Sequence, residues 1–280
     1  MAAQAPALRI RALTLMDVLD ESFRIYRANF PLFAGLAVLL AIPLLAIQLL
    51  SGTTNVFSTY YQALINNGTG PPPTFTAGNP FIALLQYPVQ LALLPFDFAA
   101  LYAAAVAIIL GRPTTIWSVL RAVLRRYWAL MALSLLYGLA FVAFVCPPVG
   151  IWLVTKLSLL FPALFTEEAS VGTALDRTWR LTDRAFWRTF AILLLSYVLA
   201  QALQYALGAL FLALAFVVPG LPIEIRIFLV VAVVTLMAQI VQPLFSIAVT
   251  LLYFDLRVRR EAFDLEVMAY QLSLPEGSRS

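Results

Sequence analysis

Two ionisable residues, Asp97 and Lys156, lie deep within long apolar stretches of the 280-residue sequence. A charged side chain at the centre of a membrane costs roughly 2.5–3.5 kcal/mol on insertion scales, so its presence there needs a reason. Counting about 1.5 Å per residue from the nearest turns places both side chains at nearly the same depth. We predict that Asp97 and Lys156 face each other or share a polar cavity, either as a structural ion pair or as part of a path for protons or a substrate.

A second candidate site is a set of arginines on amphipathic segments. The segment LDRTWRLTDRAFWR, residues 175–188, carries six charges in fourteen positions between uncharged runs. On a helix its arginines fall on one face and its aliphatic and aromatic residues on another, which is typical of a helix lying in the lipid headgroup layer. Each arginine near an anionic membrane surface adds roughly 1 kcal/mol of attraction. We call the predicted interfacial arginines the arginine cuff: Arg24, Arg27, Arg121, Arg125, Arg177, Arg180, Arg184 and Arg188.

Two interpretations of the arginine cuff stay open. The amphipathic helices either only anchor and orient the spans that follow them, or they also form a site for lipid headgroups or a protein partner. Helix starts are expected at Thr14, with Asp17 three residues later, and at Ser170, because these residue types cap helix N-termini.

The sequence lacks the residues of several common enzyme classes. It contains no histidine, which excludes Ser-His-Asp and Cys-His catalysis, HExxH zinc sites and haem ligation through histidine. It has no Walker loop and no GxGxxG motif, so nucleotide use is unsupported. Its one cysteine, Cys146, excludes an intramolecular disulfide framework. We therefore expect no enzyme activity, no metal site and no cofactor.

The candidate residues must be positioned by a chain with the composition of a membrane protein. It is 62% hydrophobic and 11% charged, against about 45–50% and about 25% in soluble domains. Its long uncharged runs supply the roughly 20 apolar residues that a membrane-spanning helix needs. The sequence predicts an all-α, multi-pass membrane protein, a single domain over residues 1–280, with six spans. These are Phe30–Leu50, Phe81–Leu110, Tyr127–Cys146, Val149–Thr166, Thr189–Val218 and Ile227–Asp255.

The basic residues orient these spans. Of the 18 Lys and Arg residues, all except Arg226 and Lys156 fall before span one or after spans two, four and six. Six spans place these groups on one side of the membrane, which the positive-inside rule makes the cytoplasmic side. We predict a plasma-membrane protein with both termini cytoplasmic, whose positive charge reflects membrane orientation rather than nucleic-acid binding.

The amphipathic segments recur along the chain. LDRTWRL at 175–181 is echoed by LDESFRI at 19–25, and a weaker third copy, RAVLRRYW, begins at Arg121. Each copy leads directly into an odd-numbered span. The sequence therefore predicts a pseudo-threefold internal repeat of three hairpins, each preceded by an amphipathic interfacial helix. The units cover about residues 14–110, 114–166 and 170–256, followed by a cytoplasmic tail at 257–280. Kinks are expected in the second helices, at Pro95, Pro162 and Pro243.

Four blocks of sequence resemble a known family. They are LTLMDVLDESFRIYRANF (13–30), GRPTTIWSVLRAVLRRYW (111–128), SVGTALDRTWRLTDRAFWRTF (170–190) and LYFDLRVRREAFDLE (252–266). In this order they resemble a bacterial six-span family named for the membrane domain of glycerophosphoryl diester phosphodiesterase. The most specific piece is a tail motif made of Tyr253, Asp255, Arg257, Arg259, Phe263, Asp264 and Glu266.

The resemblance implies a stand-alone membrane domain in the bacterial plasma membrane. Some members of the family carry a fused phosphodiesterase barrel, whose chemistry uses histidines and metal-binding carboxylates. This chain has no histidine and no room for a barrel, so the activity in the family name is not expected here. The tail around Phe263 is expected to fold back, so that Glu261, Asp264 or Glu266 pairs with arginines of the interfacial helices.

We expect a non-catalytic integral membrane protein that interacts with lipid or serves as a scaffold. Its expected partners are membrane lipids with anionic headgroups at the cytoplasmic face, with a membrane-protein partner or a second copy of the chain as further candidates. The alternative is a small transporter or lipid-handling protein whose intramembrane polar site is formed by Asp97 and Lys156.

Overall fold

The computed structural model describes residues 14–50, 80–167, 170–183, 185–217 and 223–261. This part of the chain is helical and contains no strand. Its elements are α1 (Leu15–Ala28), α2 (Phe30–Leu50), α4 (Pro80–Ile109), α5 (Ile116–Arg125), α6 (Tyr127–Val142), the 3-10 helix η1 (Ala143–Val145), α7 (Pro147–Leu157), α8 (Leu160–Glu167), α9 (Val171–Asp183), α10 (Phe186–Val217) and α11 (Ile223–Glu261).

The predicted all-α chain with six candidate spans is confirmed. Six helical segments of the described chain are long and apolar enough to cross a membrane, and each overlaps one predicted span. They are Phe30–Ile47, Tyr87–Ile109, Tyr127–Val145, Pro147–Glu167, Phe186–Phe211 and Phe228–Arg259. Large apolar side chains on them, such as Leu139 and Leu210, are exposed. Lipid would cover these side chains in a membrane, so the exposure is what a multi-pass protein requires.

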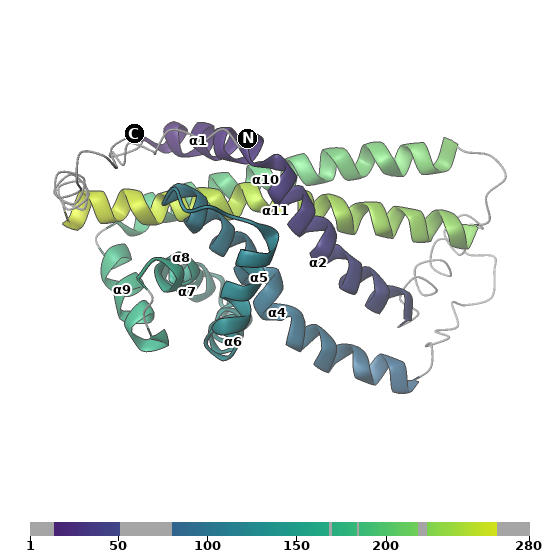
Figure 1. Cartoon of the computed structure of the whole chain (residues 1–280), viewed down its shortest axis with the longest axis horizontal. Coiled ribbons are helices and arrows are strands. Elements are labelled where there is room, and N and C mark those ends of the chain that lie inside the picture. Colours follow the sequence, from purple (N-terminus) through teal and green to yellow (C-terminus); the bar gives the residue numbers. More distant parts are fainter. Residues whose placement is uncertain (1–13, 51–79, 168–169, 184, 218–222, 262–280) are drawn as a thin grey trace.

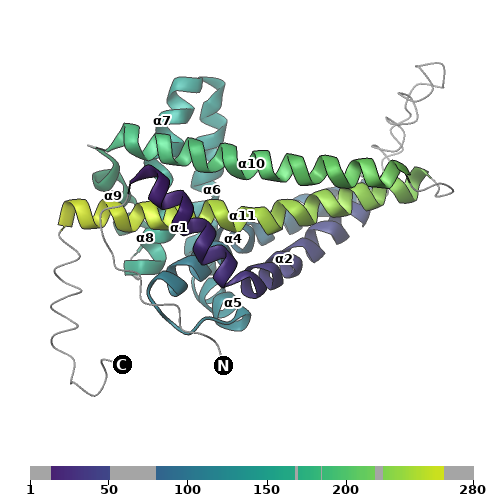
Figure 2. The same ribbon diagram turned by 90° about the horizontal axis from the view of Figure 1, so that it is seen from above.

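Helix α11 forms the centre of the molecule. Figures 1 and 2 both show α10 alongside it, and α1, α2, α4, α8 and α9 also pack against it. Every residue from Ser246 to Leu256 is buried. A helix that is buried on all sides must lie inside its fold. The core therefore surrounds the C-terminal half of α11.

Helices α6 and α7 extend in a different direction from α10 and α11. In Figure 2 they project to one side of the long α10–α11 pair. They contact each other and are joined through η1 and Cys146. The other successive span helices, α2 with α4 and α10 with α11, are also in contact. Three hairpins sharing one direction therefore remain a prediction, although each pair of helices touches.

The fourth predicted span is divided into α7 and α8. The helix is interrupted at Ser158 and Leu159, and Pro162 lies in the first turn of α8. Proline has no backbone N–H, and its ring clashes with the carbonyl four residues earlier, which is that of Ser158. The kink predicted at Pro162 is therefore a break in the helix. Pro95 and Pro243, in contrast, lie within the continuous helices α4 and α11.

Each of the three amphipathic helices, α1, α5 and α9, begins with a hydroxyl cap. Thr14 accepts a hydrogen bond from the Asp17 amide at 3.2 Å, and the Asp17 carboxylate accepts from the Thr14 amide at 2.8 Å. Thr115 and Ser118 make the same reciprocal pair at α5. At α9 the Thr173 amide donates to Ser170 Oγ at 3.3 Å. The caps predicted at Thr14 and Ser170 are confirmed, and they fix where each helix begins.

The buried face of the amphipathic helices follows a common register. The residues four and eight positions after the cap are buried in each helix: Val18 and Ser22 in α1, Val119 and Val123 in α5, and Ala174 and Thr178 in α9. One or two residues separate each amphipathic helix from the span helix that follows it. The same local design therefore precedes α2, α6 and α10.

Tyr26 attaches α1 to the central helix. Its hydroxyl donates to the Ile240 carbonyl at 2.8 Å. Burial raises the pKa of Tyr26 to about 12, because the charged phenolate loses its solvation. The hydroxyl consequently stays protonated at neutral pH and keeps its hydrogen bond to α11.

The turn between α6 and α7 depends on Gly150. A Cβ at this position would lie 2.7 Å from Phe144 Cγ and 2.8 Å from the Phe144 Cα, which belongs to the backbone. We expect Gly150→Ala to destabilise the protein by about 1–3 kcal/mol, as overpacking does. Thermal unfolding in detergent micelles measures this. Gly138→Ala on α6 is the control, because its Cβ would meet no atom within 4 Å. Equal melting temperatures for the two variants would contradict the close approach.

Candidate functional site

Glu167, the last residue of α8, joins three helices through its carboxylate. Its Oε1 accepts from Arg177 Nε of α9 at 2.7 Å and from the Tyr253 hydroxyl of α11 at 2.7 Å. Arg257 Nε, one turn further along α11, lies 3.9 Å from the same oxygen. Sequence analysis missed Glu167. The signal was its position, because it is an acidic residue immediately after an uncharged span and before the arginines of 175–188.

Asp255 is the second carboxylate at this end of the molecule, and its side chain is fully buried. Arg188, near the start of α10, donates to Asp255 Oδ2 from Nη2 at 2.9 Å and from Nε at 3.2 Å. Arg259, one turn later on α11, donates from Nε to Asp255 Oδ1 at 3.0 Å. Charged hydrogen bonds of this kind are about twice as strong as neutral ones. Asp255 thus holds the start of α10 against the end of α11.

We call these seven residues the inner network: Glu167, Arg177, Arg188, Tyr253, Asp255, Arg257 and Arg259. It unites four residues of the predicted tail motif with two arginines of the predicted cuff. The side chains of Arg177 and Arg257 are 18% and 12% exposed. Such arginines are committed to carboxylates inside the protein, so the inner network is a structural tie between α8, α9, α10 and α11.

The remaining described cuff arginines point outward. Exposed side chains belong to Arg24, Arg27, Arg121, Arg125 and Arg180, which we call the outward cuff. Arg24 is 65% exposed and pairs with Glu21 within α1, and Arg180 is 67% exposed and pairs with Asp176 within α9. Arg121 lies over the ring of Trp117 at 5.7 Å. The structure therefore divides the predicted cuff into an inward group and an outward group.

Exposed aromatic residues accompany the outward cuff. Trp117 on α5, Trp128 at the start of α6 and Trp187 at the start of α10 are 61%, 81% and 77% exposed. Tryptophan is typical of the membrane–water interface, where its ring is apolar and its N–H reaches water. Arginine beside exposed tryptophan is the surface expected of a protein in contact with lipid headgroups.

No protein-family model, curated protein or solved structure matches this chain. The chemistry of the site must therefore be judged from its own residues. Within the described ranges, no group of three His, Cys, Asp or Glu side chains could hold a metal ion. Arg184, Phe263, Asp264 and Glu266 lie outside the described residues. The predicted return of the tail to the arginine cuff accordingly stays a prediction.

Lys156 does not pair with Asp97, and that prediction was wrong. The Lys156 side chain is 5% exposed, and its Nζ donates to Asp183 Oδ1 at the end of α9. The ammonium also lies 5.3 Å from the ring of Trp179, which packs edge-on against Trp152. A depth counted in residues does not show which neighbouring helix a side chain faces, and Lys156 faces α9 whereas Asp97 faces α11. Asp183 was missed because its partner lies 27 residues away in the sequence.

Asp97 on α4 instead faces Gln239 on α11. Gln239 Nε2 donates to Asp97 Oδ1 at 2.8 Å. Gln239 is 8% exposed, and its Oε1 has no hydrogen-bond partner among the described residues. Asp97 is half-buried, and no basic side chain of the described chain pairs with it. The two intramembrane charges thus occupy separate sites with different partners.

A line of polar residues follows one face of α11. Gln239, Ser246 and Tyr253 are seven residues apart, which places them on the same side of a helix. Gln239 and Tyr253 hydrogen-bond to Asp97 and Glu167 on other helices, whereas Ser246 donates to the Gln242 carbonyl of its own helix. Each step rises about 10.5 Å. The line therefore runs along α11 from the Asp97 site to the inner network.

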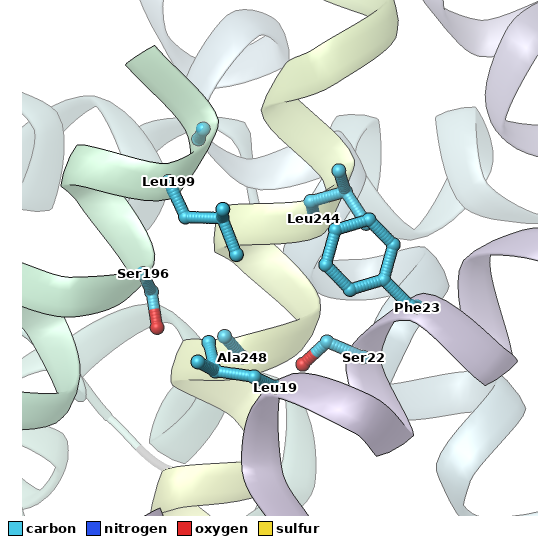
Figure 3. A pocket seen from close by; sticks show the side chains of 8 residues that line it. Leu19, Ser22, Phe23, Ser196, Leu199, Leu244 and Ala248 are labelled. Atoms are coloured by element: carbon cyan, nitrogen blue, oxygen red, sulfur yellow. The ribbon is translucent and has the colours of Figure 1, made fainter. Parts of the chain in front are cut away.

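A small groove lies between α1, α10 and α11 (Figure 3). Leucine and phenylalanine side chains such as Leu19 and Phe23 line it, together with the hydroxyl groups of Ser22 and Ser196. It encloses about 240 Å³ of atom-free space, including its open mouth. Asp97 does not line this groove, so it is not the polar cavity predicted for Asp97 and Lys156.

The buried position of Asp255 generates a stability prediction. Asp255→Asn removes the charge that both Arg188 and Arg259 face, and breaking a buried pair costs about 3–5 kcal/mol. Asp176→Asn is the matched control, because Asp176 and Arg180 are 63% and 67% exposed and such pairs contribute about 0–1 kcal/mol. Thermal unfolding of both variants in detergent should therefore show a large decrease only for Asp255→Asn. Similar decreases would show that Asp255 is not the tie described here.

Proposed function

We propose that this chain is a non-catalytic, multi-pass membrane protein that binds anionic lipid headgroups through its outward cuff. The observation that carries the proposal is the exposure of Arg24, Arg27, Arg121, Arg125 and Arg180 on three amphipathic helices, beside exposed tryptophans. Guanidinium groups bind phosphate through several directed hydrogen bonds. Interfacial helices of this kind bind by combining apolar burial with attraction to anionic lipid.

The proposal includes three hairpins related by an internal repeat, each preceded by an interfacial helix. The common register of cap and buried residues in α1, α5 and α9 supports this. Figure 1 offers further support, since α1 and α9 lie toward the end of the molecule where α10 begins and α11 ends. The far ends of α2, α4, α10 and α11 extend the opposite way. One membrane face could therefore carry the arginines, with both termini cytoplasmic in a bacterial plasma membrane.

We also propose that the chain is a stand-alone member of the six-span family named for the glycerophosphoryl diester phosphodiesterase membrane domain. The support is the order of the four sequence blocks and the inner network, which involves Tyr253, Asp255, Arg257 and Arg259 of the tail motif. These residues act here as helix ties rather than as acid–base groups. The proposal accordingly includes no phosphodiesterase activity and no cofactor.

The lipid-binding proposal is tested by changing the charge of the outward cuff. The five outward arginines are replaced together by glutamine, and the preference of the protein for phosphatidylglycerol over phosphatidylcholine is measured in nanodiscs by energy transfer from tryptophan to labelled lipid. Each arginine contributes roughly 1 kcal/mol, and 1.4 kcal/mol is a factor of ten. We expect the preference to fall by at least about tenfold.

Lysine replacements of the same five arginines are the matched control. Lysine keeps the positive charge, so these variants should retain most of the preference for phosphatidylglycerol and lose it at high salt. An unchanged preference in the glutamine variant would refute lipid binding by the outward cuff. If a protein, rather than a lipid, co-purified with the wild-type chain and not with the glutamine variant, the scaffold interpretation would be favoured instead.

A further inference from the structure

The Asp97–Gln239 site contains more hydrogen-bond acceptors than donors. Asp97 contributes a carboxylate without a basic partner in the described chain, and Gln239 contributes an amide oxygen that is buried without a partner. The donor group of the pair, Gln239 Nε2, already gives one of its two N–H groups to Asp97 Oδ1. Leaving a buried acceptor unpaired costs about 1–3 kcal/mol. A ligand that offers only positive charge would satisfy these oxygens.

Pro243 adds a further acceptor beside them. In an α-helix the Gln239 carbonyl would accept from the amide of residue 243, but proline has no N–H. Helix α11 nevertheless continues through this position. The Tyr26 hydroxyl donates a hydrogen bond to the next carbonyl, that of Ile240, at 2.8 Å. The Gln239 carbonyl therefore lacks its usual helical donor.

We propose that Asp97 and Gln239 form an intramembrane binding site for a small monovalent cation. Carboxylate, amide and backbone oxygens are the ligands that hard cations prefer. A single carboxylate balances a single positive charge, and uncompensated charge inside a membrane is costly. A divalent cation would leave one positive charge without compensation at this site.

A proton satisfies the site less completely than a cation. On Asp97 it would donate one hydrogen bond, for which Gln239 Oε1 is an acceptor, and it would leave the Gln239 backbone carbonyl without a donor. A monovalent cation contacts several oxygens at once, so it can bridge Asp97 of α4 and Gln239 of α11. Asp97 is half-buried on α4, and Gln239 is buried on α11. Binding should consequently hold α4 and α11 together and stabilise the fold.

Thermal unfolding in detergent tests this with sodium as the probe. NaCl replaces choline chloride at constant total chloride, so that ionic strength and screening do not change. We expect a saturable rise in melting temperature for the wild type and no sodium-dependent rise for Asp97→Asn. For Gln239→Leu the half-saturating sodium concentration should increase about tenfold, as for loss of one neutral ligand.

Gln242→Leu is the matched control, because Gln242 lies three residues further along the same helix and is exposed. It should keep the wild-type response to sodium. If Asp97→Asn does not fold, the comparison of Gln239→Leu with Gln242→Leu decides. Equal melting temperatures in sodium and choline would overturn the proposal, as would equal responses of the two glutamine variants. It would also fail if acidification in choline gave the whole stabilisation and sodium added nothing.

Discussion

The buried carboxylate of Asp255 is the interaction on which the inner half of this molecule depends. A charge in an apolar core is tolerated only with hydrogen-bonded counter-charges. Arg188 and Arg259 supply them from α10 and α11. Glu167 has the same requirement and meets it with Arg177 and Tyr253. Because these partners belong to different helices, satisfying two carboxylates fixes how α8, α9 and α10 meet α11.

That constraint determines what the amphipathic helices present to the outside. Arg177 and Arg188 are drawn inward by carboxylates, whereas Arg180, one turn further along α9 than Arg177, stays exposed and pairs with Asp176 of its own helix. In α1 the tie is neutral, because Tyr26 donates to the backbone of α11 and no arginine is needed there. The arginines of α1 can therefore remain exposed. The exposed arginines are thus those that the buried carboxylates have not paired with, and it is these that we propose bind anionic lipid.

The helical class and the spans could be predicted from the sequence because both depend on local composition. Uncharged runs and hydroxyl caps are read within about twenty residues, and the spans and the caps at Thr14 and Ser170 were predicted correctly. Partners that lie far apart in the sequence were not predicted. Glu167, Asp183 and Gln239 were missed because their partners lie 10, 27 and 142 residues away. Lys156 was given the wrong partner because a depth counted along the sequence does not show which neighbouring helix a side chain faces.

The two intramembrane charges differ in a way that bears on what Asp97 is for. Lys156 has an opposite charge in Asp183, whose carboxylate is 56% exposed, so its pair is complete and reaches the surface. The hydrogen-bond partner of Asp97 is the neutral side-chain amide of Gln239. If its role were to join α4 to α11, asparagine would serve better, since a second amide could accept from Gln239 Nε2 and also donate to Gln239 Oε1. An ionised carboxylate leaves that oxygen unpaired and adds a charge that the membrane penalises. Unlike asparagine, an ionised aspartate calls for a positive charge beside it, which the proposed cation would supply.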